Sequence, residues 1–530
     1  MLADLPPGTV VTRVEAPCGV GVAWPGGSGV VERSASWRAD LRWAWWAPGV
    51  PGVPASWDLA AVAGLVHGLR RADPAAVWAA AHGLPVPAPQ RGEPSLFDLG
   101  SGEPVTGDGQ LDASWASGGW TESPASVRRW AELALDVQQR QAEALGRLGR
   151  RALLTAHAES AVSLLCLEMA RGGLPFDAGV AAGLLTRMLG PRPEDAAHEA
   201  AQRRERDDRV LATLPPGTAV DLRSPEQVRA VLARLGIDVP DTRSWRLEPH
   251  ASASPTVAAL LAWRKADRVA TTYGWRWLDG AVSGGRLRGA WAVADGGAGR
   301  MTAGAGLHNM PAELRPAVRA DPGHVLVGAD LGQVEPRVLA VVSGDRALAR
   351  AAAADDMYAP VAAQLGVDRP TAKVAVLAAM YGQTSGAAGT ALRDMDRVYG
   401  TAMAYLRAAE QVGRDGGELR TYGGRLLRFG AITDVPGRGR YARNAMVQGA
   451  AAELFKAWAA TVRAGLAGTG GQIVLCLHDE LLLHVPVAAA AAAQALLRDA
   501  LEQTVSWWGG GTGVRFVAAV RAGASWTDVH

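Results

Sequence analysis

The chain has little cysteine and no uninterrupted apolar run of the kind that crosses a membrane. Its three cysteines, Cys18, Cys166 and Cys476, are scattered, and their spacing matches neither a zinc site nor a disulfide framework. The longest apolar stretches are too short or too rich in Ala and Gly to span a bilayer. The chain also does not open with the charged segment and apolar core of a secretory signal. We therefore expect a protein of the reducing cytoplasm that does not associate with membranes.

Lysine is scarcer still, because only Lys265, Lys373 and Lys456 occur among 54 basic residues. The abundance of Ala, Gly and Arg indicates a GC-rich coding bias. Against that bias, a retained lysine indicates a position where a compact ammonium is needed, which binds as a point charge and can donate a proton. The formal net charge of +2 neither favours nor excludes nucleic acid, because affinity depends on local patches.

Two apolar runs far apart in the sequence end in carboxylates. The run 324–329 is followed by Asp330, and the run 473–477 is followed by His478, Asp479 and Glu480. Each run predicts a buried strand, and the apolar residues after Glu480 predict a hairpin with the acids at its turn. If the strands are neighbours in one sheet, Asp330 and Asp479 lie side by side. Two like charges at close range need cations between them, as in a two-metal nucleotidyl-transfer site.

A third segment, residues 369–382, places four side chains in one stripe. Arg369, Lys373, Leu377 and Tyr381 recur every four residues, which on a helix makes a stripe about 18 Å long. Two cations one turn apart suit a triphosphate, and an aromatic ring at the far end suits a base.

In this order the three segments resemble the motifs of family A DNA polymerases, the bacterial DNA polymerase I type. Residues 330–337 resemble D-Y-S-Q-I-E-L-R, residues 369–382 resemble R-x3-K-x3-F/Y-x3-Y-G, and residues 478–480 are the H-D-E motif. Further matches are 299–302 with 308–311 (G-R-L-S and Q-N-I-P), 421–425 (T-x-x-G-R), 444–453 (N-x-x-x-Q-G-T-A-A-D) and 523–526 (G-x-x-W). The resemblance spans roughly 155–530, and six motifs in order, before the closing G-x-x-W, leave little room for chance.

The resemblance implies an α+β multidomain fold: a right-hand polymerase with an antiparallel palm sheet and helical fingers and thumb, preceded by a small α/β RNase H-like domain. The implied bounds are thumb about 155–290, palm about 291–345 and 425–530, and fingers about 346–424. Residues 1–150 would be a degenerate 3′–5′ exonuclease-like domain. No D-x-E occurs in these residues, and where the family's Y-x3-D would fall, Trp130 is followed by Ala134. Without these acids a two-metal exonuclease site cannot assemble.

The resemblance also implies a role for each matched position. Catalytic roles fall to Asp330, Asp479, Glu480 and Lys373, and the metal ligands are Asp330, Asp479 and the Leu331 carbonyl, holding two Mg²⁺ ions for which Mn²⁺ can substitute. Nucleotide binding falls to Arg369, Lys373, Leu377, Tyr381, Gln333, Glu335 and Leu331. DNA binding falls to Arg300, Asn309, Asn444, Gln448, His478, Arg264 and Arg268. A buried Glu335 needs a partner, and we expect a nearby hydroxyl to provide it.

Plainer interpretations exist for several of these residues. Asp330 and Asp479 taken singly read as turn acids at strand ends. Glu480 reads equally as a solvated acid, and His478 as a packed histidine. Arg369 and Lys373 read as a solvated helix face.

Two positions depart from the family pattern, because Leu331 and Leu377 stand where relatives have aromatic residues. Loss of a stacking ring removes on the order of 1–3 kcal/mol of binding free energy, so nucleotide binding should weaken. The expected protein is a monomeric, template-directed DNA polymerase that uses primer-template DNA and dNTPs. It would lack proofreading and act in replication-associated repair or lesion bypass. The alternative is a non-catalytic DNA-binding pseudo-polymerase, which the two leucines favour.

Overall fold

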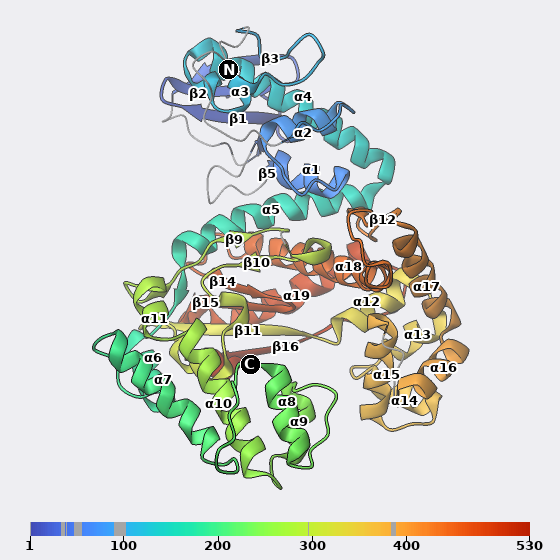
Figure 1. Cartoon of the computed structure of the whole chain (residues 1–530). Coiled ribbons are helices and arrows are strands. Elements are labelled where there is room, and N and C mark those ends of the chain that lie inside the picture. The colour runs from blue at the N-terminus through green and yellow to red at the C-terminus, as the bar shows by residue number, and fades with distance from the viewer. Residues whose placement is uncertain are drawn as a thin grey trace.

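The computed structural model describes residues 2–32, 38, 40–46, 56–88, 102–294, 296–382 and 388–530. A small N-terminal body lies above a larger C-terminal body, and one long helix runs between them (Figure 1). In the larger body a central sheet is flanked by helices of residues 178–281 at the lower left and centre, and by helices of residues 346–415 at the right (Figure 1). This is the arrangement expected of palm, thumb and fingers.

The N-terminal body is built on a mixed sheet of five strands in the order β3-β2-β1-β4-β5. β1, β2 and β3 are antiparallel, whereas β4 runs parallel to β1 and β5 parallel to β4. This is the small α/β, RNase H-like domain that the sequence predicts. Its elements are β1 (Val10–Ala16), β2 (Gly19–Trp24), β3 (Gly27–Val31), β4 (Arg42–Trp45), β5 (Ser56–Asp58), α1 (Leu59–His67), α2 (Pro74–Ala81), α3 (Ala113–Ala116) and α4 (Pro124–Leu148).

α4 lies directly on this sheet because Gly21 has no side chain. A Cβ at Gly21 would collide with the backbone of Val127. The helix then buries Trp130, which stacks on Trp46 at a centroid distance of 4.6 Å and on Trp120 at 5.5 Å. The tryptophans of this chain therefore serve largely as core.

α5 (Arg150–Gly172) joins the two bodies. By length and composition it is apolar enough to cross a membrane, which the sequence analysis did not expect of any segment. However, 67% of its apolar window is buried inside the protein, as in the core helix of a globular fold. It contacts α1, α4 and β5 on one side and α18 (Val435–Gly465) on the other.

The thumb region is a set of helices followed by short strands. Its helices are α6 (Ala178–Leu189), α7 (Ala196–Leu211), α8 (Pro225–Arg234), α9 (Ser244–Leu247), α10 (Pro255–Thr272) and α11 (Trp275–Ala281). The strands in and beside this region are β6 (Leu174–Pro175), β7 (Val282–Ser283), β8 (Arg286–Leu287), β9 (Trp291–Ala292) and β10 (Thr302–Ala303).

The palm sheet is antiparallel, with strand order β14-β15-β11-β16, which confirms the predicted sheet type. Its strands are β11 (His324–Gly332), β14 (Gln472–Leu477), β15 (Glu480–Pro486) and β16 (Val517–Gly523). The helices around it are α12 (Val334–Ser343), α18, α19 (Ala490–Trp508) and α20 (Trp526–Val529). The largest apolar core joins this sheet to α12, α18 and the fingers.

The fingers region is helical apart from a small hairpin at its end. It comprises α13 (Arg346–Ala351), α14 (Tyr358–Leu365), α15 (Arg369–Tyr381), α16 (Ala388–Val398), α17 (Gly400–Asp415), β12 (Glu418–Arg420) and β13 (Leu426–Arg428). α15 begins where Asp368 caps it, since the Asp368 carboxylate accepts the Thr371 N–H at 2.8 Å, and Pro370 occupies the first turn.

Candidate active site

The strand register brings the two acids together at one end of the palm sheet. Asp330 lies on the central strand β11, directly opposite Glu480 on β15 and Ala519 on β16. Asp479 lies in the turn before β15, where the left-handed backbone of His478 (φ 54°) reverses the chain. The Leu331 N–H donates to the Asp479 carbonyl at 3.1 Å, so the turn is fastened to β11 beside Asp330.

Burial and mutual repulsion dominate the electrostatics of this pair. Burial, followed by the Asp330 charge, raises the pKa of Asp479 to about 7. Burial also raises the pKa of Asp330. Two carboxylates in this state are stabilised by a hard cation, and Mg²⁺ takes one or two carboxylates together with substrate phosphates and water. Among the described residues, no group of three or more His, Cys, Asp or Glu side chains is placed to hold a metal ion by itself.

Glu480 differs from the other two acids because a protein donor holds it. Its Oε1 accepts the Trp526 indole N–H at 2.6 Å, and its Oε2 lies 3.5 Å from Nδ1 of His530. Only 3% of the residue is exposed, so the interpretation as a solvated acid is wrong.

Glu335 is the centre of a second cluster beside the acids. It lies in the first turn of α12, forms an ion pair with Arg300 and accepts the Tyr381 hydroxyl at 2.9 Å. The expected hydroxyl partner is therefore Tyr381 at the end of α15. Burial and the Glu335 charge raise the pKa of Tyr381 to about 12, with Arg300 and Gln448 opposing that shift. This cluster ties α15 to the palm.

Of the two cations on the α15 stripe, one forms an ion pair within the protein and the other does not. Arg369 donates to Asp356 at 2.6 Å and lies over the Tyr358 ring at 5.7 Å. Lys373 is exposed and makes no ion pair with any described residue. Leu377 is partly buried against the large core.

Asp356 is a member of the site that the sequence analysis missed. It accepts the Gln333 amide at 2.7 Å as well as Arg369, so it joins two predicted nucleotide-binding residues. It stands in a loop between α13 and α14, and no periodic pattern marks it. The only sequence signal was its place as an acid before Met357 and Tyr358, midway between the first two motifs.

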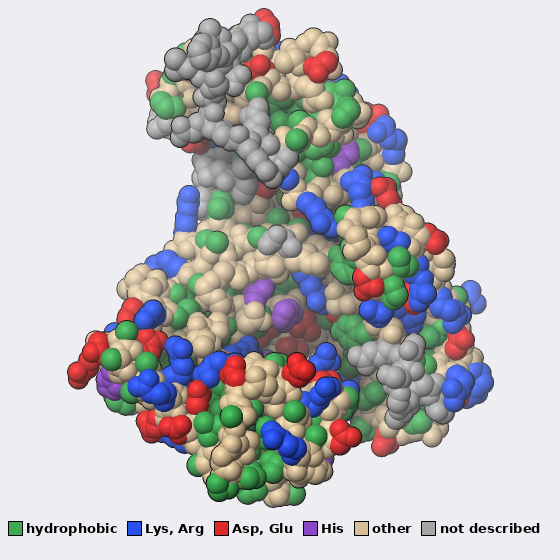
Figure 2. All heavy atoms as spheres, viewed as in Figure 1, with side chains coloured by type: hydrophobic (Ala, Val, Ile, Leu, Met, Phe, Trp, Pro, Cys, Tyr) green, Lys and Arg blue, Asp and Glu red, His purple; other side chains and the backbone are tan. Residues whose placement is uncertain are grey.

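The predicted DNA-binding residues fall into two groups. Asn444 and Gln448 lie one turn apart on α18, and the Asn444 Oδ1 is buried with no partner among the described residues. The His478 ring lies 5.7 Å from the His308 ring, and its pKa is lowered by burial and then by Arg300. Gln448 and His478 lie near the Glu335 cluster, because Gln448 acts on the pKa of Tyr381, and Arg300 and Glu335 act on that of His478. A hollow between thumb and fingers has histidine and acidic side chains at its floor and Lys and Arg along its rim (Figure 2).

The thumb arginines are not gathered with the acids. Arg264 donates to the hydroxyl of Thr242 at 2.9 Å and to its carbonyl, so it holds a loop of the thumb itself. Arg268 donates to the carbonyl of Asn309 at 3.1 Å, and Asn309 is exposed. Both arginines lie on α10, which ends at Thr272, before α11 begins at Trp275.

Among the described N-terminal residues, no group of three or more His, Cys, Asp or Glu side chains is placed to hold a metal ion. On β1 the buried positions include Thr12, which donates to the Ala131 carbonyl at 2.7 Å, and Arg13, which pairs with Glu15 at 2.8 Å. Asp58 is the buried carboxylate of this body, and it caps α1 and accepts the Ser163 hydroxyl.

Known proteins that are similar to this chain are DNA polymerases. A family model described as DNA polymerase family A matches residues 194–528. DNA polymerase I of Deinococcus radiodurans is 26% identical over 320 residues, 53% of this chain and 32% of that protein. The thermostable DNA polymerase I of Thermus filiformis is 28% identical over 302 residues, 49% of this chain and 35% of that protein. DNA polymerase theta of Caenorhabditis elegans is 26% identical over 225 residues, 40% of this chain and 14% of that protein.

The matched part of this chain thus spans about a third of the length of these bacterial relatives. A solved structure, the POL domain of Pol1 from M. smegmatis in complex with DNA primer-template and dNTP, superposes with a TM-score of 0.68. It is 20% identical, and the superposition covers 98% of this chain and 96% of that one. The likeness in fold therefore includes the N-terminal body.

Proposed function

The chain belongs to DNA polymerase family A, and from this premise we propose that it is a template-directed DNA polymerase. It would add deoxynucleotides to the 3′ end of a primer. The observation that carries the proposal is the meeting of Asp330 and Asp479 at one end of the palm sheet, next to the Glu335–Tyr381 contact that anchors α15. The M. smegmatis structure holds primer-template and dNTP, and its fold is shared by this chain.

In this proposal Asp330 and Asp479, with the Leu331 carbonyl, hold two divalent cations, which we take to be Mg²⁺. Bound there, the cations would lower the pKa of the primer 3′-hydroxyl and neutralise the triphosphate. Lys373 and Arg369 contact the phosphates and stabilise the charge that develops on the leaving pyrophosphate. Glu335 and Tyr381 close the sugar end of the site, and Gln448 and Arg300 donate to minor-groove acceptors of the primer end.

We further propose that the enzyme does not proofread, and that it acts in repair or lesion bypass rather than in accurate bulk synthesis. The support is the lack of a pair of buried acids among the described residues of the N-terminal sheet, where Asp58 is buried and Glu15 is exposed, together with Leu331 and Leu377 in place of aromatic residues. The partners would be primer-template DNA and dNTPs, with the protein acting as a monomer. The free thiols of its three cysteines suit the cytoplasm.

A primer-extension experiment with the full chain tests the proposal. We expect extension with Mg²⁺ or Mn²⁺, and none by Asp330→Asn, while both proteins bind duplex DNA with similar affinity. Binding without extension by the wild type would make the chain a pseudo-polymerase. Templates that carry an abasic site or an adduct then test bypass, which the proposal expects to exceed that of a proofreading relative.

A further inference from the structure

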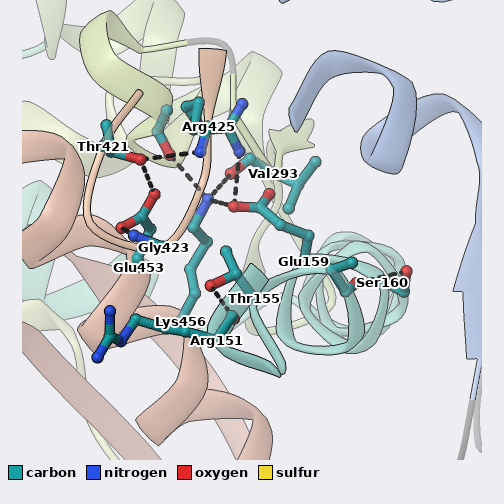
Figure 3. A network of polar contacts seen from close by, with 12 residues as sticks. Arg151, Thr155, Glu159, Ser160, Val293, Thr421, Gly423, Arg425, Glu453 and Lys456 are labelled. Atoms are coloured by element: carbon teal, nitrogen blue, oxygen red, sulfur yellow. Dashed lines mark hydrogen bonds and ion pairs between the residues drawn. The ribbon is translucent and has the colours of Figure 1, made fainter. Parts of the chain in front are cut away.

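A buried ionic network connects α5 to Arg425 and to Lys456 on α18 (Figure 3). Its centre is Glu159 on α5, which is fully buried and accepts from both Arg425 and Lys456. The Arg425 donation spans 2.6 Å. Burial favours a neutral Glu159, but the two cations outweigh it and hold the pKa of this carboxyl below its ordinary value. Burial lowers the pKa of Lys456, and the Glu159 charge opposes that shift. The opposite charges compensate one another, the condition under which buried ions are tolerated.

Lys456 uses its ammonium on the backbone as well as on Glu159. Its Nζ donates to the Gly299 carbonyl at 2.8 Å and to the Val293 carbonyl at 3.4 Å, and only 1% of the side chain is exposed. An ammonium donates in three directions from one atom, which suits three acceptors that converge on a point. A planar guanidinium cannot reproduce that geometry, which is a physical reason for lysine in a chain that otherwise uses arginine.

The held carbonyl belongs to the residue just before Arg300. The loop is strained: Ala298 has φ 59°, and Gly299 has φ 88°. A Cβ at Gly299 would run into the guanidinium of Arg425. Arg425 thus packs against this loop from one side while Lys456 holds its carbonyl. Arg300, the next residue, forms an ion pair with Glu335, which also accepts the Tyr381 hydroxyl.

The other side of α5 faces the N-terminal sheet. Ser160, adjacent to Glu159, points away from the network (Figure 3). Its hydroxyl accepts the Asp58 N–H at 3.0 Å, and its carbonyl accepts the Ser56 hydroxyl at 3.1 Å. One turn of α5 thus joins the edge strand β5 to the network beneath the site.

We propose that Lys456 is a positioning residue for primer-end recognition: by fixing the Gly299 carbonyl it aims Arg300 at Glu335 and at the primer terminus. Glu159 in turn fixes Lys456, and through α5 it connects the position of Arg300 to the N-terminal body. The inference rests on the proposed polymerase function and assigns the acid-free N-terminal body a part in it, as the support that holds α5 in place.

Lys456→Arg is the principal test, with Lys265→Arg as the matched control. Both changes keep the charge, but Lys265 is exposed on the thumb, where it pairs with Glu313. We expect Lys456→Arg to lower the single-turnover extension rate about tenfold, the effect of one misaligned charge-assisted hydrogen bond. Lys265→Arg should stay within about twofold of wild type, as expected for an exposed pair.

Primers that end in guanine or in 3-deazaguanine separate positioning from a general structural role. The deaza base lacks the N3 acceptor, so wild type should bind that primer end more weakly, which anisotropy measures without catalysis. Lys456→Arg should lose this discrimination between the two primers, and so should Arg300→Ala. The double variant should bind the two primers no differently from either single variant. A wild type that discriminates but never extends would refute the polymerase function and leave the positioning intact.

Discrimination that persists in Lys456→Arg, with only a lower melting temperature, would overturn the proposal. If that variant shows no cooperative melting transition, Glu159→Gln takes its place, because it removes one charge at constant shape. A folded Glu159→Gln that keeps the discrimination would overturn the proposal equally. Rates that fall additively in the Lys456→Arg, Arg300→Ala double variant would do the same.

Discussion

At Asp479, burial and the neighbouring Asp330 charge act in one direction and raise the pKa from 3.8 to about 7. The folded, metal-free protein therefore holds a proton on Asp479 between about pH 4 and 7 that the unfolded chain releases. This contribution to stability is fully present below the unfolded pKa and is lost as pH rises through 7. A change of this size corresponds to at most about 4 kcal/mol.

We predict that, in EDTA, Asp479→Asn is more stable than wild type at pH 8, and that this advantage shrinks toward pH 5. The melting temperatures of the two proteins, compared across that range, check the prediction. His67 and His484, whose pKa values burial lowers to about 4, are common to both proteins and cancel in the comparison. Mg²⁺ should raise the melting temperature of wild type at pH 8 and not that of Asp479→Asn. A difference that does not depend on pH would contradict the assigned electrostatics.

Leu377 offers a second test at a single side chain. It lies one turn beyond Lys373 and is partly buried against the core. We predict that Leu377→Phe strengthens nucleotide binding several-fold, the factor that about 1 kcal/mol of restored stacking supplies. Single-turnover rates across a range of dNTP concentrations measure the change.

The control for Leu377→Phe is Leu377→Met, which keeps the volume of the side chain without adding a ring. An unchanged or weaker apparent affinity in the Phe variant, with Met near wild type, would mean that the space beside α15 is already filled. Overpacking would then lower activity instead.

At the scale of helices and loops, the loop before α14 makes the contact that holds the start of α15. Arg337 is fully buried and donates to the carbonyls of Ala352 at 2.8 Å and Asp355 at 2.5 Å. That loop is therefore rigid, and its last acid, Asp356, holds Arg369 at the start of α15. A triphosphate that binds Arg369 must compete with Asp356, so the ion pair should weaken nucleotide binding.

We predict that Asp356→Asn lowers the apparent KM for dNTP about two- to fivefold, because exposed or half-exposed pairs contribute up to about 1 kcal/mol. The matched control is Asp355→Asn, which breaks only the surface pair with Arg515. Steady-state extension over a dNTP series gives both values. A higher KM in Asp356→Asn would show that Asp356 orders Arg369 for the phosphates rather than competing with them.

The sequence predicts elements better than it predicts their partners. The periodic spacing of Arg369, Lys373 and Tyr381 is enough to place a helix, and the apolar runs before Asp330 and Asp479 are enough to place strands. The pair Arg369–Asp356 escapes prediction because it depends on how a loop of irregular backbone crosses α15. Similarly, nothing in the apolar sequence of α5 indicates that Glu159 has a partner nearly 300 residues away in the chain.

Over the whole molecule, contacts of the described residues attach the N-terminal body to the polymerase body at the turn of α5 around Ser160 and at the hairpin β12–β13. Arg420 donates to the Val66 carbonyl at 3.1 Å, and Arg428 donates to that of His67, at the end of α1. These contacts satisfy the last carbonyls of α1 with donors from another domain, so the N-terminal body is fixed to the palm. This holds although its described residues include no pair of buried acids.

We predict that the purified chain has no 3′–5′ exonuclease activity on single-stranded or mismatched ends. The acid on β1, Glu15, is exposed and pairs with Arg13, and Asp58, the buried carboxylate of this body, caps α1 and accepts the Ser163 hydroxyl. A lone carboxylate whose oxygens are already engaged cannot assemble a two-metal site.

The measurement is release of the 3′ nucleotide from a labelled mismatched primer, without dNTPs and with Mg²⁺ or Mn²⁺. Asp330→Ala serves as background, because it removes any reversal of synthesis at the polymerase site. The expected rate in both proteins is that of buffer alone. Degradation that persists in Asp330→Ala but disappears in a folded Asp58→Asn would show that the N-terminal body holds a working nuclease site. The N-terminal body would then be an active nuclease as well as a domain that packs against the palm.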